Sequence, residues 1–165
     1  MIQIKNAAEL QKMRKACAIS AAALKAGGEA IEPGITTAEI DKIIYDFIVR
    51  HGARPNFLHL YGFPATACIS VNDTVIHGIP NKQQQIRPGD IVSIDTGCKI
   101  DGFNGDNACT YACGKIDLEA QRLLDVTKES LHRGIEMACG GNRVGDIGHA
   151  VQSYVEENGF SVVRT

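Results

Sequence analysis

The sequence of 165 residues predicts an α/β fold with an internal duplication whose second copy is incomplete. Stretches with apolar residues three and four positions apart indicate helices, and short apolar runs bounded by glycine and proline indicate strands. A shift of 107 residues lays the second helical stretch on the fourth, which indicates the duplication. We therefore expect a single partial domain over residues 1–165, with a first repeat at 1–112 and the helices that open a second repeat at 113–165.

Capping boxes mark the N-termini of the first two helices, because a polar residue is followed three positions later by glutamate. Asn6 with Glu9 begins the first helix, and Thr36 with Glu39 begins the second. Gly52 is expected just after the end of the second helix. In the first helix, residues spaced by three or four form one stripe that we expect to be buried: Leu10, Met13, Cys17, Ala21, Leu24, Gly28 and Ile31.

Strands are predicted after a loop that spans residues 53–65. The first strand covers 67–71. The second covers 91–100 and the third 103–112, and Asp101-Gly102 between them is a two-residue hairpin signal. These three strands give the first repeat its sheet.

Two more helices follow at about 117–138 and 144–158, and residues 160–165 are expected to open another strand. Amphipathic helices often match by chance, but glycines bracket the second and the fourth helix at the same offset, which favours a real duplication. A complete second copy would extend to about residue 219, so we expect the chain to be part of a longer protein. The matched residues are Gly34 with Gly141, Ile40 with Ile147, Ile44 with Val151, Phe47 with Tyr154, Ile48 with Val155 and Gly52 with Gly159.

Composition and charge exclude several classes of function. A net charge of −2 gives no basic footprint for DNA or for an anionic membrane. No apolar run approaches the roughly 20 residues of a membrane span, and the N-terminus lacks the apolar block of a signal peptide. We therefore expect a cytoplasmic protein. The six cysteines have no CxxC pair, which is typical of reduced and mostly buried thiols.

Two aspartates in the predicted hairpin are the first candidates for chemistry, because carboxylates are unfavourable in strands. A two-residue turn at Asp101-Gly102 would place Gly97 opposite Asp106 and would make Asp95 a diagonal neighbour of Asp106, with Cβ atoms about 7–8 Å apart. Carboxylates at that spacing repel each other unless a divalent cation lies between them. Alternatively, one aspartate is a solvated edge residue and the other caps a turn. A one-residue bulge would also break the shared face.

Three segments carry a resemblance to a known family. They are Val-Asn-Asp-Thr-Val-Ile-His-Gly-Ile-Pro at 71–80, Gly-Asp-Ile-Val-Ser-Ile-Asp at 89–95 and Asp-Gly-Phe-Asn-Gly-Asp at 101–106. Together they resemble the type I, bacterial-type methionine aminopeptidases, and the order of helices and loops agrees over the whole chain. Prolidases and creatinases share the fold and the two aspartates but lack the His-Gly-Ile-Pro segment in this form. The resemblance implies the pita-bread fold of the M24 metallopeptidases and removal of the N-terminal methionine from nascent polypeptides.

The resemblance also implies roles for individual residues. Asp95 and Asp106 would be metal ligands, with Asp106 bridging two divalent ions, which could be manganese, iron, cobalt or zinc. The ions would activate water and polarise the carbonyl of the N-terminal methionine. His77 would be the catalytic residue that hydrogen-bonds to the scissile amide, although a loop histidine taken alone indicates little.

A pocket for the methionine side chain is implied around Phe63 and Cys68, with Leu60 and Phe57 as weaker candidates. Aromatic rings and sulfur make favourable contacts with a thioether, so these residue types suit methionine. Plain core packing is the alternative for Phe63 and Cys68.

Three departures from the family pattern affect this interpretation. The family usually has a Gly-His-Gly segment after a stretch like residues 160–164, and none occurs before Thr165. A histidine ligand and both glutamate ligands, including the general base, would therefore lie outside this sequence, and we expect this chain alone to be inactive. Asn107-Ala108-Cys109 replaces hydroxyl and basic residues that are common in the family. Leu60 and Phe57 also differ from the common pocket residues.

Two other interpretations remain open. The chain could be a non-catalytic pita-bread module that binds a partner, although such a module would not need to retain Asp95 and Asp106. It could also be a short paralogue that completes its sheet by dimerisation. For the aminopeptidase, the expected partners are the N-terminal methionine of nascent peptides, the ribosome and the missing C-terminal half.

Overall fold

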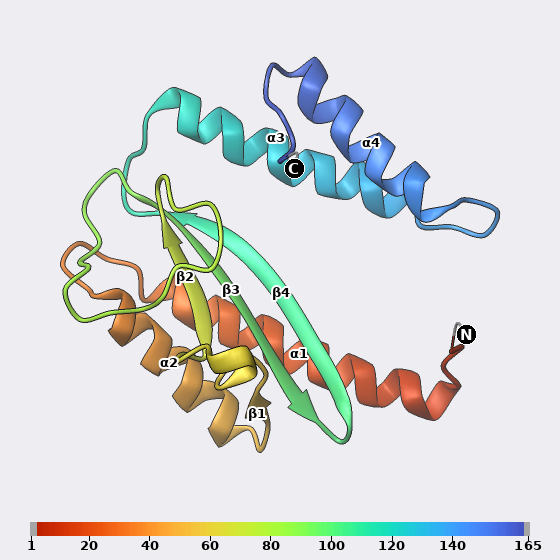
Figure 1. Cartoon of the computed structure of the whole chain (residues 1–165), viewed down its shortest axis with the longest axis horizontal. Helices are drawn as coiled ribbons and strands as arrows, with labels where there is room; N and C mark the ends of the chain where they lie inside the picture. The colour runs from red at the N-terminus through yellow and green to blue at the C-terminus, as the bar shows by residue number, and fades with distance from the viewer. Residues whose placement is uncertain (1–2, 164–165) are drawn as a thin grey trace. The chain divides into compact units, whose positions relative to one another are not determined.

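The computed structural model describes residues 3–163, which form two compact units, one ending at Ile116 and the other beginning at Asp117. The repeat boundaries predicted at residues 112 and 113 stay a prediction. Figure 1 shows the elements of both units. The first unit contains α1 (Ala7–Glu29), α2 (Thr37–Arg50), β1 (Arg54–Pro55), a 3-10 turn η1 (Leu60–Gly62), β2 (Ala67–Val71), β3 (Ile91–Ile100) and β4 (Phe103–Ala112), and the second contains α3 (Leu118–Glu136) and α4 (Val144–Glu157).

The sheet of the first unit is antiparallel, with β3 between β2 and β4, and with β1 paired to the far end of β3. The register of β3 with β4 runs without a break from Ile91 opposite Ala112 to Ile100 opposite Phe103. Gly97 stands opposite Asp106, as the hairpin signal predicted. Because side chains alternate between the two faces of a sheet, Asp95 and Asp106 share a face.

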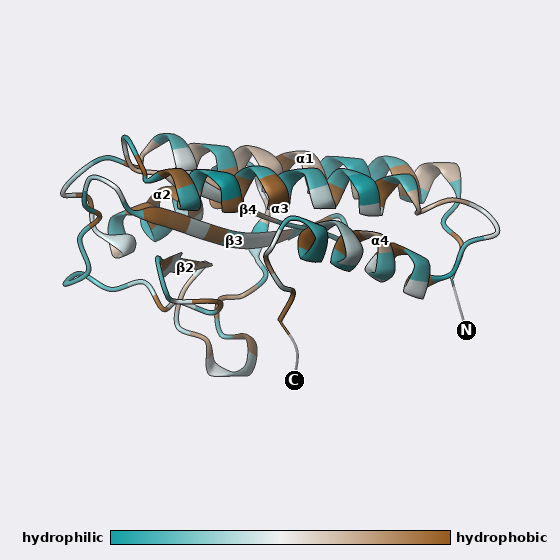
Figure 2. Cartoon of the chain, turned by 90° about the horizontal axis from the view of Figure 1, so that it is seen from above, coloured by the Kyte–Doolittle hydropathy of each residue, from teal (hydrophilic) through white to brown (hydrophobic). Residues whose placement is uncertain are grey.

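The face of β3 that bears the even-numbered residues packs against α1 and α2. Val92 and Ile94 are completely buried there, together with Ile40, Ile44 and Ile48 of α2. Figure 2 shows β3 beneath these two helices, with hydrophobic residues along the strand. This core fixes the strand, and the odd-numbered residues of β3 consequently point to the opposite face.

The buried face of α1 differs from the predicted stripe. Cys17 and Ala21 are exposed, and Leu10 is 40% exposed. The prediction followed the three- and four-residue spacing of apolar residues, whereas α1 approaches the sheet closely: Cys98 Sγ donates to Ala16 O at 3.5 Å, and the Ser20 hydroxyl donates to Asn107 Oδ1 at 2.6 Å. Small side chains permit that approach. The buried residues are Ala16, Ser20, Ala23, Leu24 and Gly27.

The two helix pairs repeat each other at the predicted offset of 107 residues. Helices α1 and α3 end at Glu29 and Glu136, while α2 and α4 begin and end at positions that differ by the same number. A Cβ atom added at Gly27 would lie 2.7 Å from Ile44, and one added at Gly134 would lie 2.8 Å from Val151. Each pair therefore crosses at a glycine that leaves room for the equivalent residue of its partner helix.

Three smaller predictions are tested by the structure. The cysteines are free, but the expectation of mostly buried thiols is wrong, because Cys17, Cys109 and Cys139 are exposed. Residues 160–163 form no strand, and residues 164 and 165 lie outside the described part. Of the helices formed by residues 3–163, none combines the length and the apolar character that crossing a membrane requires.

Candidate active site

Asp95 and Asp106 lie on the face of the sheet opposite α1 and α2. Asp95 stands on β3 between the buried residues Ile94 and Thr96, and is itself only half-exposed. Burial, followed by the charge of Asp106, raises the pKa of the Asp95 carboxyl, while His77 lowers it. The three ionisable groups are therefore close enough to sense one another. No lysine or arginine within residues 3–163 forms an ion pair with either aspartate.

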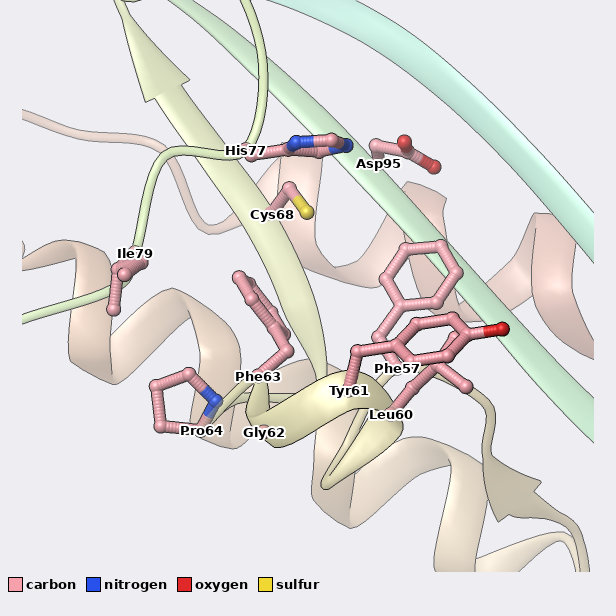
Figure 3. Close-up of a pocket in the computed structure, with 10 residues that line it drawn as sticks. All are labelled: Phe57, Leu60, Tyr61, Gly62, Phe63, Pro64, Cys68, His77, Ile79 and Asp95. Atoms are coloured by element: carbon pink, nitrogen blue, oxygen red, sulfur yellow. The ribbon is translucent and has the colours of Figure 1, made fainter.

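His77 sits on a loop that is attached to β2. Gly78 O accepts a hydrogen bond from Ile69 N at 2.9 Å, and Gly78 N donates to Ser70 Oγ at 3.1 Å. His77 has a backbone φ of 57°, in the left-handed region that is unusual for a residue with a side chain. Figure 3 shows the imidazole and the Asp95 carboxylate at the same end of a pocket. The loop therefore brings His77 to the face that carries the aspartates.

A cavity of about 460 Å³ opens beside these groups. All four residues predicted for a substrate pocket line it, and so do His77 and Asp95, whereas Asp106 is not part of its lining. Figure 3 shows polar groups toward one end and aromatic rings toward the other. The lining consists of Phe57, Leu60, Tyr61, Gly62, Phe63, Pro64, Cys68, His77, Ile79 and Asp95.

Cys68 connects the polar and the apolar ends of the pocket. It pairs with Asp95 across β2 and β3, so the two side chains are neighbours on one face. Burial first, and then the carboxylates of Asp95 and Asp106, raise the pKa of the Cys68 thiol to about 11. The thiol is consequently protonated at neutral pH and behaves as a small apolar group.

Asp41 of α2 fixes the start of β2 and the pocket segment that precedes it. Its Oδ1 atom accepts hydrogen bonds from Thr66 N at 2.9 Å and from Ala67 N at 2.8 Å. Burial raises the pKa of Asp41 more than these hydrogen bonds lower it. The same carboxylate thus ties α2 to the strand that bears Cys68.

Sequence reasoning missed four residues that line the pocket: Tyr61, Gly62, Pro64 and Ile79. Tyr61 is fully exposed and has a backbone φ of 50°. The turn-forming composition of Tyr-Gly-Phe-Pro predicted a loop but gave no sign of which side chains would face a cavity. For Ile79 the sequence offered one indication that it would line the pocket, because it lies two residues after His77.

The donor atoms at this site fit a divalent cation, but the set is partial. Carboxylate oxygens are the hard donors that such ions prefer, and Asp95 and Asp106 present them from neighbouring strands. Across residues 3–163, no group of three or more histidine, cysteine, aspartate or glutamate side chains could hold a metal ion. A bound ion would therefore need further ligands besides these two.

Comparisons with known proteins agree with this geometry. A sequence model described as metallopeptidase family M24 matches residues 11–165. The methionine aminopeptidase of Clostridium perfringens is 51% identical over 164 residues, which cover 99% of this chain and 66% of that relative. Methionine aminopeptidase 1 of Bacillus subtilis is 44% identical with the same coverage. The crystal structure of methionine aminopeptidase from Rickettsia prowazekii matches with a TM-score of 0.96 at 38% identity and covers 99% of this chain and 66% of that one.

These matches confirm the expected pita-bread α/β fold. The chain spans 66% of the length of these relatives.

Proposed function

The chain belongs to metallopeptidase family M24, and on this premise we propose that the whole protein is a methionine aminopeptidase, which removes methionine from the N-terminus of peptides. The observation that carries the proposal is the convergence of His77 and Asp95 on an apolar pocket, with Asp106 on the same face of the sheet. A binding module without catalysis is less favoured, because the relatives are named as aminopeptidases.

The pocket suits the methionine side chain. Its volume of about 460 Å³ is within the usual range for small-molecule sites. Phe57 and Phe63 offer aromatic rings, and the protonated thiol of Cys68 adds a polarizable sulfur atom. Thioethers interact favourably with both groups. Leu60 completes the proposed pocket as an aliphatic contact.

Each residue of the site has a proposed role in the reaction. Asp95 and Asp106 would hold divalent cations through their carboxylate oxygens. Such ions lower the pKa of water and polarise a carbonyl. His77 would donate a hydrogen bond to the scissile amide, where charge develops in the transition state. The left-handed backbone of His77, with a φ of 57°, sets where its Cβ atom projects from the loop.

Several finer points belong to the same proposal. Two divalent ions are expected. Carboxylate donors bind manganese, iron, cobalt and zinc, so they do not by themselves select one of these metals. The ribosome as a partner, a C-terminal half that completes the site and the cytoplasmic location are carried from the resemblance as predictions. With only two carboxylates to hold the ions, we expect this chain alone to release negligible methionine from a Met-Ala-Ser peptide.

Titration with Mn²⁺ tests the proposed metal site, because this paramagnetic ion broadens NMR signals of nearby nuclei. We expect broadening to begin at the amides of Asp95 and Asp106. Substitutions Asp95→Asn or Asp106→Asn should weaken binding at least about tenfold, since each removes a charged ligand. Asp101→Asn is the matched control: Asp101 is an exposed carboxylate on the same hairpin, paired with Lys15 at 2.7 Å, and asparagine suits its turn position.

Broadening that is unchanged in Asp95→Asn and Asp106→Asn would contradict the proposed metal site. Stoichiometric binding of two ions at micromolar affinity would contradict the expectation that this chain alone is inactive.

The pocket is tested with Met-Ala and Lys-Ala dipeptides. Met-Ala should shift the signals of Phe63 and Cys68 more strongly than Lys-Ala does. Equal shifts would remove the support for methionine as the substrate side chain.

A further inference from the structure

The loop that carries His77 is hydrogen-bonded to β2 through the glycine that follows His77. Ile69 N donates to Gly78 O at 2.9 Å, and Gly78 N donates to the Ser70 hydroxyl oxygen at 3.1 Å. A Cβ atom at Gly78 would lie 2.2 Å from Ile69 O, so only glycine allows the loop to approach the strand this closely. One backbone bond and one side-chain bond thus attach the residue that follows His77.

Of these two hydrogen bonds, the one to the Ser70 side chain is the one that a substitution can remove. His77 adopts a φ of 57°, and a left-handed conformation persists in a residue with a side chain only where surrounding contacts enforce it. His77 itself is exposed, whereas Ser70 is 4% exposed. Contacts that enforce this conformation therefore come from the buried side of the loop, where Ile69 and Ser70 both bind Gly78.

Ser70 is also fixed relative to the aspartates. It lies two residues after Cys68 on β2, so its side chain is on the same face as Cys68 and Asp95. Ser70 pairs with Ser93 of β3, and the Ser93 hydroxyl lies 2.8 Å from the Thr110 hydroxyl of β4. A row of hydroxyls therefore crosses the three strands beside the row that contains Asp95.

We propose that Ser70 is a positioning residue for His77, which sets the distance between the imidazole and the metal-binding carboxylates by holding Gly78 N. The proposal rests on the proposed aminopeptidase function, since it assigns His77 a partner in that reaction. Ser70 would touch neither substrate nor metal. Its effect would pass entirely through the loop.

The test compares Ser70→Ala, which removes the acceptor, with Ser70→Thr, which retains a hydroxyl. Two readouts are measured on the full chain: hydrogen exchange of the Gly78 amide, and broadening of the His77 ring protons by Mn²⁺. In Ser70→Ala we expect Gly78 exchange to rise about tenfold, as for the loss of one hydrogen bond. Broadening of the His77 ring should fall, while broadening of the Asp95 amide stays unchanged. Ser70→Thr should restore both readouts.

Ser93→Ala is the matched control, because Ser93 belongs to the same hydroxyl row but contacts Thr110 instead of Gly78. It should leave both readouts as they are in the unmodified chain. Unchanged Gly78 exchange in Ser70→Ala, or an equal loss in Ser93→Ala, would overturn the proposal. Failure of the proposed function has a different signature: Mn²⁺ would not broaden Asp95 even in the unmodified chain. Gly78 exchange needs no metal, so it would still test whether Ser70 holds the loop.

Discussion

Individual polar side chains hold the pocket together over long sequence distances. Asp41 satisfies the backbone N–H groups of Thr66 and Ala67, both of which are buried. A buried N–H group that loses its acceptor costs about 1–3 kcal/mol. The raised pKa of Asp41 indicates that burial disfavours its charge more than these bonds favour it. The oxygen atom therefore matters more to the fold than the charge does.

We accordingly expect Asp41→Ala to lower the free energy of unfolding by about 1–3 kcal/mol, and Asp41→Asn to have a much smaller effect because it retains an oxygen acceptor. Urea denaturation at neutral pH measures both. Asp46→Ala is the control on the same helix, since within the described residues the Asp46 carboxylate pairs only with the exposed Lys42. If Asp41→Asn lowered the free energy of unfolding as much as Asp41→Ala does, the charge of the carboxylate would also be needed to stabilise the fold.

A second residue-scale effect concerns the contact between β4 and α1. The Tyr111 hydroxyl donates to Leu24 O at 3.4 Å, and burial is the main cause that raises the pKa of Tyr111 to about 12. An unfolded tyrosine titrates near 10, so the folded state favours the neutral phenol. This contribution to stability is complete below about pH 10 and is lost as pH rises toward 12. Tyr111→Phe should reduce the loss of stability between about pH 10 and 12 in urea titrations, and an unchanged loss would show that other groups cause it.

Helix crossings are the feature that the two units share at the scale of elements. Gly134 of α3 faces Val151 of α4 so closely that an added Cβ would lie 2.8 Å away, and valine has little rotamer freedom in a helix. Gly148, by contrast, lies in α4 with nothing within 4 Å of an added Cβ. The same substitution should therefore have opposite effects at the two positions.

We expect Gly148→Ala to stabilise the chain by up to about 1 kcal/mol through helix propensity. Gly134→Ala gains the same propensity but adds an overpacking cost of about 1–3 kcal/mol, so its net effect should be destabilising. Thermal unfolding followed by circular dichroism compares the two variants. Stabilisation by both would mean that α3 and α4 move apart at little cost.

At the scale of the whole molecule, the sequence predicted those features of the fold and the site that depend on the chemistry of neighbouring residues. The Asp101-Gly102 turn fixed the register that brings Asp95 and Asp106 to one face. The α1 stripe was wrong because helix–sheet distance, which selects small residues, has no local signature. The attachment of Gly78 to Ser70 could not be predicted either, since it joins residues from different elements. The roles of the site residues stay predictions until metal and substrate are tested.

The two units differ in how much apolar surface they bury, although their helix pairs correspond. The first unit encloses a continuous core between two helices and a sheet. In the second, Val126 and Val155 are buried, whereas Leu131 and Ile135 are each 58% exposed. These two exposed residues correspond to Leu24 and Gly28, which lie 107 positions earlier in the chain and contact Tyr111 in the first unit.

Because local opening becomes easier as buried apolar contact decreases, we expect amides of α3 and α4 to exchange with solvent faster than those of β3. Hydrogen exchange followed by mass spectrometry measures this directly on the intact chain. Leu131→Ser, which changes an exposed position, should leave the rates nearly unaltered, while Val126→Ala should accelerate exchange in α3 and α4 alone. If β3 exchanges as fast as α3, the two units open together and the difference in their cores does not govern stability.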